Sequence, residues 1–82
     1  MTELRETTEL MESGSHRDRF KAEYYQLNIR IDRLAEMLNK YRAGVLEFEP
    51  ICPYELLRDQ IEVMIKYREI LRERALIEHI DL

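Results

Sequence analysis

Five side chains near the start of the longest periodic stretch could bind phosphates and nucleobases. They are Arg17, Arg19, Lys21, Tyr24 and Tyr25. A guanidinium group can hold phosphate through two parallel hydrogen bonds, the start of a helix attracts anions, and a tyrosine ring can stack on a base. The alternative is a solvated basic face, with Tyr24 in an apolar seam. Arg17, Arg19, Lys21 and Tyr25 are therefore candidate ligand-binding residues.

A second basic group lies later in the chain. It consists of Tyr67, Arg68, Arg72 and Arg74. Arg68 interrupts an apolar stripe, and a charge inside such a stripe needs a partner. It could pair with Asp32 or Glu36 across a helical hairpin, or it could help to hold an anion at an interface. Arg72 joins the candidate ligand-binding residues.

The sequence offers no catalytic motif and no metal-ligand spacing. His16 and His79 have no second histidine, cysteine or paired carboxylate at ligand spacing around them. Cys52 precedes a proline and has no histidine near it, so we expect a buried small hydrophobic side chain rather than a nucleophile. A glycine-rich phosphate loop is also missing. We expect a protein that is not an enzyme and needs neither a cofactor nor a metal.

Length and composition predict one small all-α domain. The chain has 82 residues with two glycines, two prolines, 45% hydrophobic and 37% charged residues, which is typical of long helices. A domain of this size has a marginal core unless it is stapled or oligomeric. No apolar run is long enough for a signal peptide or a membrane span. We therefore expect a cytoplasmic protein that does not bind membranes.

The net charge of −4 is spread unevenly along the chain. Residues 1–15 carry one basic and four acidic side chains, residues 16–43 carry seven and four, and residues 44–82 carry five and nine. Non-specific DNA binding depends on clustered lysine and arginine, so an acidic chain makes nucleic acid an unlikely partner. A small anionic ligand at one basic patch remains compatible with this distribution.

Residues 16–43 carry the signals of one long helix. The Ser15 hydroxyl can accept from the backbone N–H of Asp18, and Gly44 can adopt the left-handed conformation that ends a helix. A heptad seam runs between these ends. It contains Phe20, Tyr24, Leu27, Ile31, Leu34, Leu38 and Tyr41. Residues 1–15 precede this helix, and we expect them to form a short helix or a loose arm.

Residues 53–78 predict a second helix, which starts at Pro53. Its apolar side chains form two neighbouring stripes. One stripe is Leu57, Ile61, Met64, Leu71 and Ala75, and the other is Leu56, Val63, Tyr67, Ile70 and Ile77. The first helix cannot cover both, so the second stripe needs either another hairpin or the N-terminal arm. We predict an antiparallel hairpin over residues 16–82 that oligomerises with itself into a four-helix bundle.

Residues 44–52 form the elbow between the two predicted helices. Pro50 and Pro53 favour an extended path, and Phe48 and Ile51 are spaced to tuck under the helix ends. We expect a rigid loop closed by an apolar plug. A loop that contacts a partner is the alternative.

The chain resembles small helical-hairpin proteins of gut bacteriophages and prophages, including relatives in crAss-like phages. The segments that carry the resemblance are FKAEYYQL and LAEML before the elbow, LEFEPICP within it, and LLRDQI and LRERA after it. Together they span nearly everything after residue 11. His79 departs from the pattern, because a glycine is expected there.

The chain is also similar, in size and architecture, to phage sponge proteins that sequester nucleotide immune signals. This resemblance implies a non-catalytic oligomer that binds a nucleotide second messenger in the cytoplasm of an infected bacterial host. It carries over no binding residue. The alternatives are a helical module that binds another protein and a structural phage protein without a small-molecule ligand.

Overall fold

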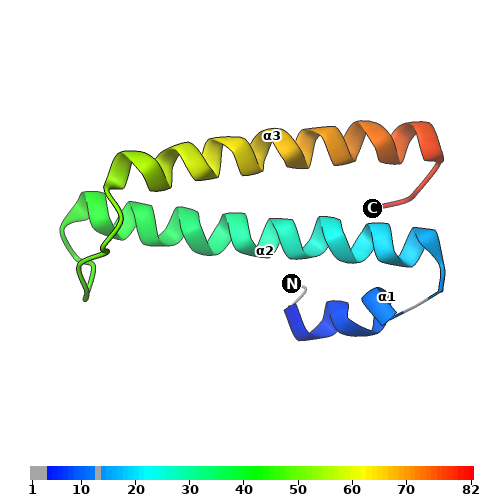
Figure 1. Cartoon of the computed structure of the whole chain (residues 1–82), viewed down its shortest axis with the longest axis horizontal. Coiled ribbons are helices and arrows are strands. Elements are labelled where there is room, and N and C mark those ends of the chain that lie inside the picture. Colours follow the sequence, from blue (N-terminus) through cyan, green and yellow to red (C-terminus); the bar gives the residue numbers. More distant parts are fainter. Residues whose placement is uncertain (1–3, 13) are drawn as a thin grey trace.

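The computed structural model describes residues 4–12 and 14–82 and consists of helices joined by short connections. A 3-10 helix, η1, spans Leu4–Thr7 and runs into α1, Thr8–Glu12. The long helices are α2, His16–Ala43, and α3, Tyr54–Glu78. Figure 1 shows α2 and α3 side by side and antiparallel, with α1 on the other side of α2. The predicted all-α hairpin is confirmed, and its completion by other chains stays a prediction.

Capping contacts fix both ends of α2 and the end of α3, whereas Pro53 precedes α3 without a side-chain capping bond. Ser15 accepts a hydrogen bond from Asp18 N at 3.4 Å, as the sequence predicted. Gly44 ends α2 in the left-handed conformation (φ 74°), and Val45 N then donates to Lys40 O at 3.0 Å. His79 ends α3 in the same way (φ 57°), and Ile80 N donates to Ala75 O at 2.9 Å. A glycine is expected at such a position because a Cβ disfavours it.

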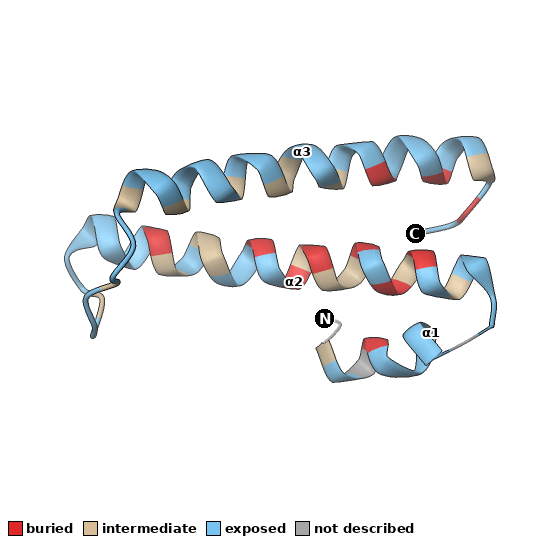
Figure 2. Cartoon of the chain, viewed as in Figure 1, coloured by how far each residue is buried: buried red, intermediate tan, exposed pale blue. Residues whose placement is uncertain are grey.

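The core lies between α2 and α3 in the half of the hairpin that is farther from the elbow. Its buried members are Phe20, Tyr24, Leu27, Ile31, Leu71, Ala75 and Ile80. Figure 2 shows that the buried residues are concentrated on α2. Seven residues of α2 are buried, against only Leu71 and Ala75 of α3. The two helices therefore contribute unequally to the core.

The N-terminal segment packs on α2 and not on α3. Thr7 is fully buried, and its hydroxyl accepts a hydrogen bond from Gln26 Nε2 at 2.9 Å. Gln26 Nε2 also contacts the Met11 sulfur. Ala22, one turn before Gln26, is buried as well. The arm thus covers the side of α2 that faces away from α3.

One apolar stripe of α3 remains exposed in the single chain, and we call it the exposed stripe. Its members are Leu56, Val63, Tyr67, Ile70 and Ile77, with exposed fractions of 40–78%. The neighbouring stripe, which includes Leu57 and Ile61, faces α2 and is half-buried or buried. Because η1 and α1 lie on α2, no element of the described residues covers the exposed stripe.

The elbow differs from the predicted apolar plug. Phe48 is 58% exposed and Ile51 is fully exposed, and Cys52 is exposed rather than buried. Pro50 and Pro53 hold this segment in an extended path, which carries these side chains past the helix ends instead of under them.

Among the described residues, no helix is long and apolar enough to cross a membrane.

Candidate functional site

Two arginines of α3 meet two uncharged polar side chains of α2 at one edge of the helix pair. Arg72 Nε donates to the Tyr24 hydroxyl at 2.9 Å, and Arg68 Nη1 donates to Asn28 Oδ1 at 3.2 Å. Tyr24 and Asn28 are one turn apart on α2, as are Arg68 and Arg72 on α3, so the two pairs face each other. We call these four residues the seam cluster.

Among the described residues, the two positive charges of the seam cluster have no carboxylate partner. Within residues 4–12 and 14–82, no ion pair joins either arginine to an acidic side chain. Over the same residues, Arg68 Nε is buried and has no hydrogen-bond partner. Buried charges are normally paired, and a buried donor without an acceptor costs about 1–3 kcal/mol. Arg72 is exposed to solvent, so the unsatisfied group of the cluster is the buried Nε of Arg68.

The Tyr24 hydroxyl lies next to Asn28 and in the electrostatic field of the two arginines. Burial raises the pKa of Tyr24, but hydrogen bonds with Asn28 and Arg72, together with the charges of Arg72 and Arg68, lower it below the ordinary value of 10.0. These neighbours favour the negatively charged form of the oxygen. The same field would favour the oxygen of a bound anion.

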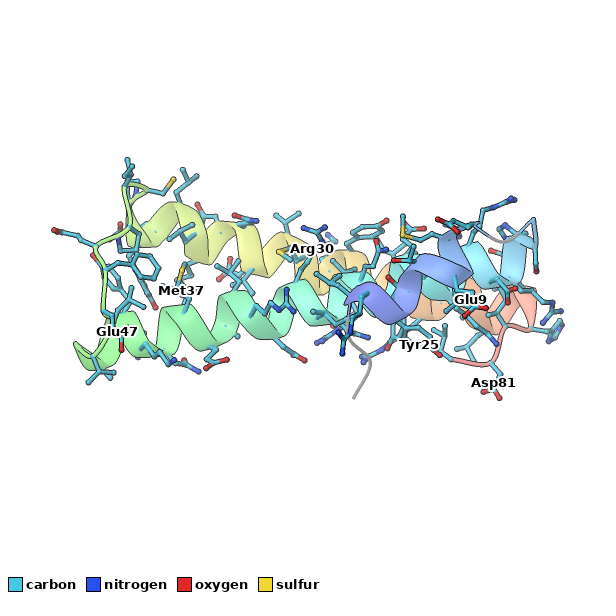
Figure 3. The ribbon with its side chains drawn as sticks, turned by 90° about the horizontal axis from the view of Figure 1, so that it is seen from below. Glu9, Tyr25, Arg30, Met37, Glu47 and Asp81 are labelled. Atoms are coloured by element: carbon cyan, nitrogen blue, oxygen red, sulfur yellow. The ribbon has the colours of Figure 1, made fainter. Side chains whose placement is uncertain are left out.

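Three of the candidate residues from α2 lie beside the seam cluster. The Tyr25 ring packs edge-on against Tyr24, with 5.9 Å between centroids. Lys21 and Arg17 precede Tyr25 by one and two turns, so the three share one side of α2. Arg17 Nη1 donates to His79 O at 2.8 Å. In Figure 3, Tyr25 and Asp81 lie along the same long edge of the molecule.

We call this side of the molecule the basic edge. It consists of Arg17, Lys21, Tyr24, Tyr25, Asn28, Arg68 and Arg72. The structure thus joins Arg72 to Tyr24, which packs against Tyr25, and helical spacing puts Lys21 and Arg17 on the same side of α2.

Arg19 is not on the basic edge. Its Nη1 donates to Gly14 O at 3.4 Å, and the side chain lines a cavity with Met11, Glu23 and Gln26 beside α1. Two residues along a helix correspond to a rotation of about 200°, which separates Arg19 from both Arg17 and Lys21. Arg74 is also engaged elsewhere, with Nε 3.3 Å from Glu78 Oε2.

The predicted ion pair of Arg68 is wrong. Arg68 donates to Asn28 rather than to Asp32 or Glu36, and Glu36 pairs with Lys40 at 3.2 Å. Asn28 is the member of the site that sequence reasoning missed. Its position could have indicated this role, because Asn28 lies four residues after Tyr24, beside the heptad seam.

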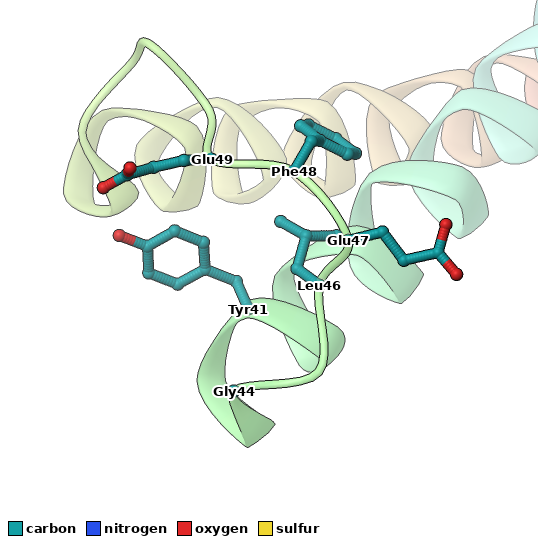
Figure 4. Close-up of a pocket in the computed structure, with 6 residues that line it drawn as sticks. All are labelled: Tyr41, Gly44, Leu46, Glu47, Phe48 and Glu49. Carbon is teal, nitrogen blue, oxygen red and sulfur yellow. The ribbon is translucent and has the colours of Figure 1, made fainter.

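The elbow holds another cavity, which suits an anion less well. Figure 4 shows its lining residues, with Leu46 and the Tyr41 ring turned toward the same space and Glu47 pointing away. The lining is Tyr41, Gly44, Leu46, Glu47, Phe48 and Glu49. Two carboxylates and no basic side chain line this cavity, so phosphate would be repelled.

Among the described residues, no group of acids, histidines and cysteines could hold a metal ion.

Comparison with known protein families gives one match. A family model described as Sequestin matches residues 14–77. Comparison with curated proteins and with solved structures gives no match. The matched range covers nearly all of both long helices and every residue of the basic edge, and it leaves out η1 and α1.

Proposed function

Because the chain belongs to the Sequestin family, a family of sequestering rather than catalytic proteins, we propose that it sequesters a nucleotide-derived host immune signal. The protein would act in a phage-infected bacterium and withhold the signal from its effector. The proposal names a ligand class, and the individual messenger is left to experiment.

The observation that carries this proposal is the Arg72–Tyr24–Tyr25 contact on the basic edge. Arg72 is held at 2.9 Å from the Tyr24 hydroxyl, and the Tyr25 ring lies against Tyr24. A guanidinium group can bind phosphate, and an adjacent ring offers a surface for a base. Lys21 and Arg17 extend the positive charge along the same side of α2. These groups match the two chemical parts of a nucleotide.

Sequestration needs affinity and no bond making. A nanomolar dissociation constant corresponds to about −12 kcal/mol of binding free energy. Arg72 and Tyr24 are already held by each other, which reduces the side-chain entropy lost on binding. Since the messenger is not destroyed, protection of the phage would depend on the amount of protein relative to the amount of signal.

Native mass spectrometry with cyclic di- and trinucleotides and cyclic ADP-ribose variants tests the proposal. We expect one of these nucleotides to be retained at fixed stoichiometry. Replacing Lys21 and Arg72 with alanine should weaken retention by at least about a hundredfold, if each lost charged contact is worth about 1.5–3 kcal/mol. Arg19→Ala is the matched control, because Arg19 faces α1. Retention of no nucleotide across the panel would contradict the proposal.

We also propose that the protein associates with itself through the exposed stripe. Leu56, Val63, Ile70 and Ile77 follow one another at intervals of seven residues, the spacing of a coiled-coil seam. Val63→Glu with Ile70→Glu should reduce the mass in solution to that of one 10.0 kDa chain, as measured by light scattering. An unmodified chain that is already monomeric would contradict self-association.

The same exposed stripe favours a second candidate function, in which α3 docks into an apolar groove of another protein. A monomeric chain that binds no nucleotide would favour this function. A protein that binds neither nucleotide nor partner would instead fit a structural phage component.

A further inference from the structure

We propose that Arg68 and Arg72 form a phosphate subsite in which a ligand phosphate supplies a counter-charge that no acidic side chain of the described residues provides. We also propose that Asn28 holds Arg68 ready for this phosphate. This inference rests on the proposed function for the identity of its natural ligand. Its geometry is independent of that function. The sequence left open whether Arg68 pairs with an acidic side chain or holds an anion, and it gave no role to Asn28.

Arg68 is the first reason for this assignment. Its Nη1 donates to Asn28 Oδ1 at 3.2 Å, whereas its Nε is buried and without an acceptor in the part of the chain that the structure describes. A guanidinium group has five N–H donors, so one neutral amide oxygen leaves most of them for another acceptor. Phosphate oxygens accept such hydrogen bonds in pairs.

The spacing of the two arginines is the second reason. Arg68 and Arg72 are one turn apart on α3, which places their Cβ atoms about 5–6 Å from each other. Each is fixed on α2 through a neutral acceptor, Asn28 or Tyr24. Like charges this close repel each other, and this repulsion is relieved when an anion binds between them. Because Arg72 is exposed, water screens part of this repulsion, and a bound phosphate would remove the rest.

The neutral side chain of Asn28 is the third reason for this assignment. A carboxylate in its place would satisfy Arg68 permanently and would repel phosphate. The amide positions the guanidinium without neutralising it. Asp32, one turn further along α2, is the nearest candidate for such a neutralising role in sequence, but Arg68 is directed to Asn28 instead.

The variant Asn28→Asp separates this inference from a purely structural role. It is nearly isosteric, and it provides Arg68 with a carboxylate. We expect its melting temperature to equal or exceed that of the unmodified protein, while its affinity for inorganic phosphate falls about ten- to a hundredfold. Asn39→Asp is the matched control, since Asn39 is exposed on the same helix and the change in net charge is identical. This control should retain full phosphate affinity.

Phosphate binding can be followed by NMR of the arginine side chains. On addition of inorganic phosphate, the Nε–H signal that disappears in Arg68→Lys should shift in the unmodified protein and in Asn39→Asp, and it should shift much less in Asn28→Asp. Equal phosphate affinity in the two aspartate variants would overturn the inference, and so would an unmodified protein in which this signal does not respond.

The proposed function and the phosphate subsite fail in different ways. If Asn28→Asp retains a nucleotide as tightly as the unmodified protein, the subsite is wrong and sequestration of a nucleotide stands. If no nucleotide binds but inorganic phosphate binds in a manner that depends on Asn28, the subsite stands and the proposed ligand class is wrong.

Discussion

The two long helices have similar lengths but differ in how the chain covers them. Helix α2 is packed on one side by α3 and on another by η1 and α1, and seven of its residues are buried. Among the described elements, helix α3 packs only on α2, and two of its residues are buried. The comparison shows that α2 is the scaffold of the fold, whereas α3 leaves most of its surface exposed. Both the arginine pair and the exposed stripe belong to α3.

The largest effect should come from the face of α3 that meets α2. Leu71 is only 1% exposed, so Leu71→Ala should lower the free energy of unfolding by about 2–5 kcal/mol through lost burial and a residual cavity. Leu76→Ala on the same helix is the control, because Leu76 is 79% exposed and its loss should change stability by less than about 0.5 kcal/mol. Chemical denaturation measures both. Equal effects would contradict the one-sided packing of α3.

A larger side chain at Ala22 tests whether η1 and α1 pack on the back of α2. Ala22 is 1% exposed and lies one turn before Gln26, which contacts the arm. Ala22→Leu should destabilise the protein by about 1–3 kcal/mol, because the larger side chain must displace its neighbours. Ala43→Leu at the exposed end of α2 is the control and should be nearly neutral. If Ala22→Leu is also neutral in denaturant titrations, the arm does not pack on α2 in solution.

Substitutions of the two left-handed residues that end the long helices, Gly44 and His79, should change the stability of the protein in opposite directions. Gly44→Ala places a Cβ at φ 74° and should cost about 1–2 kcal/mol, although no atom lies within 4 Å of the added carbon. His79→Gly relieves the same strain at φ 57° and should be neutral or stabilising by up to about 1 kcal/mol. Thermal unfolding of both variants measures the difference. A destabilised His79→Gly would show that the imidazole itself contributes to the fold.

The smallest effect concerns the contact between the end of α3 and the start of α2. A hydrogen bond from His16 at 2.7 Å lowers the pKa of Glu78 below its ordinary value of 4.5, and Arg74 lowers it further. A depressed carboxyl pKa stabilises the fold above the unfolded value, and this stabilisation disappears as the pH falls through the folded pKa. Between about pH 5 and pH 3, the melting temperature should therefore fall more for the unmodified protein than for Glu78→Gln. Parallel curves would contradict this linkage.

Signals confined to one or two turns were sufficient to predict most of the fold. Ser15 and Gly44 end α2 through hydrogen bonds to residues three to five positions away, and the heptad spacing of Phe20, Tyr24 and Leu27 defines the face that packs. These signals depend on local geometry alone, so a sequence reveals them.

Contacts between elements were harder to predict. Asn28 and Asp32 are one helical turn apart, so a shift of about 5.4 Å between α2 and α3 decides which of them meets Arg68. No local signal fixes that register. Phe48, Ile51 and Cys52 were misplaced for a similar reason, because their burial depends on the direction in which the two prolines carry the elbow. The position of Arg19 could have been predicted from helical rotation alone.

The arm on α2 has a consequence for how large an assembly can grow. Because η1 and α1 occupy the back of α2, the described residues leave one long apolar surface exposed on the helices, the exposed stripe. A surface that pairs with its own copy about a two-fold axis is used up by that pairing, whereas a chain with two different apolar surfaces can extend into a fibre. Assembly through α3 would therefore terminate at a closed pair. Such a pair remains a small diffusing particle even when the protein is abundant, and abundance is the condition under which sequestration works.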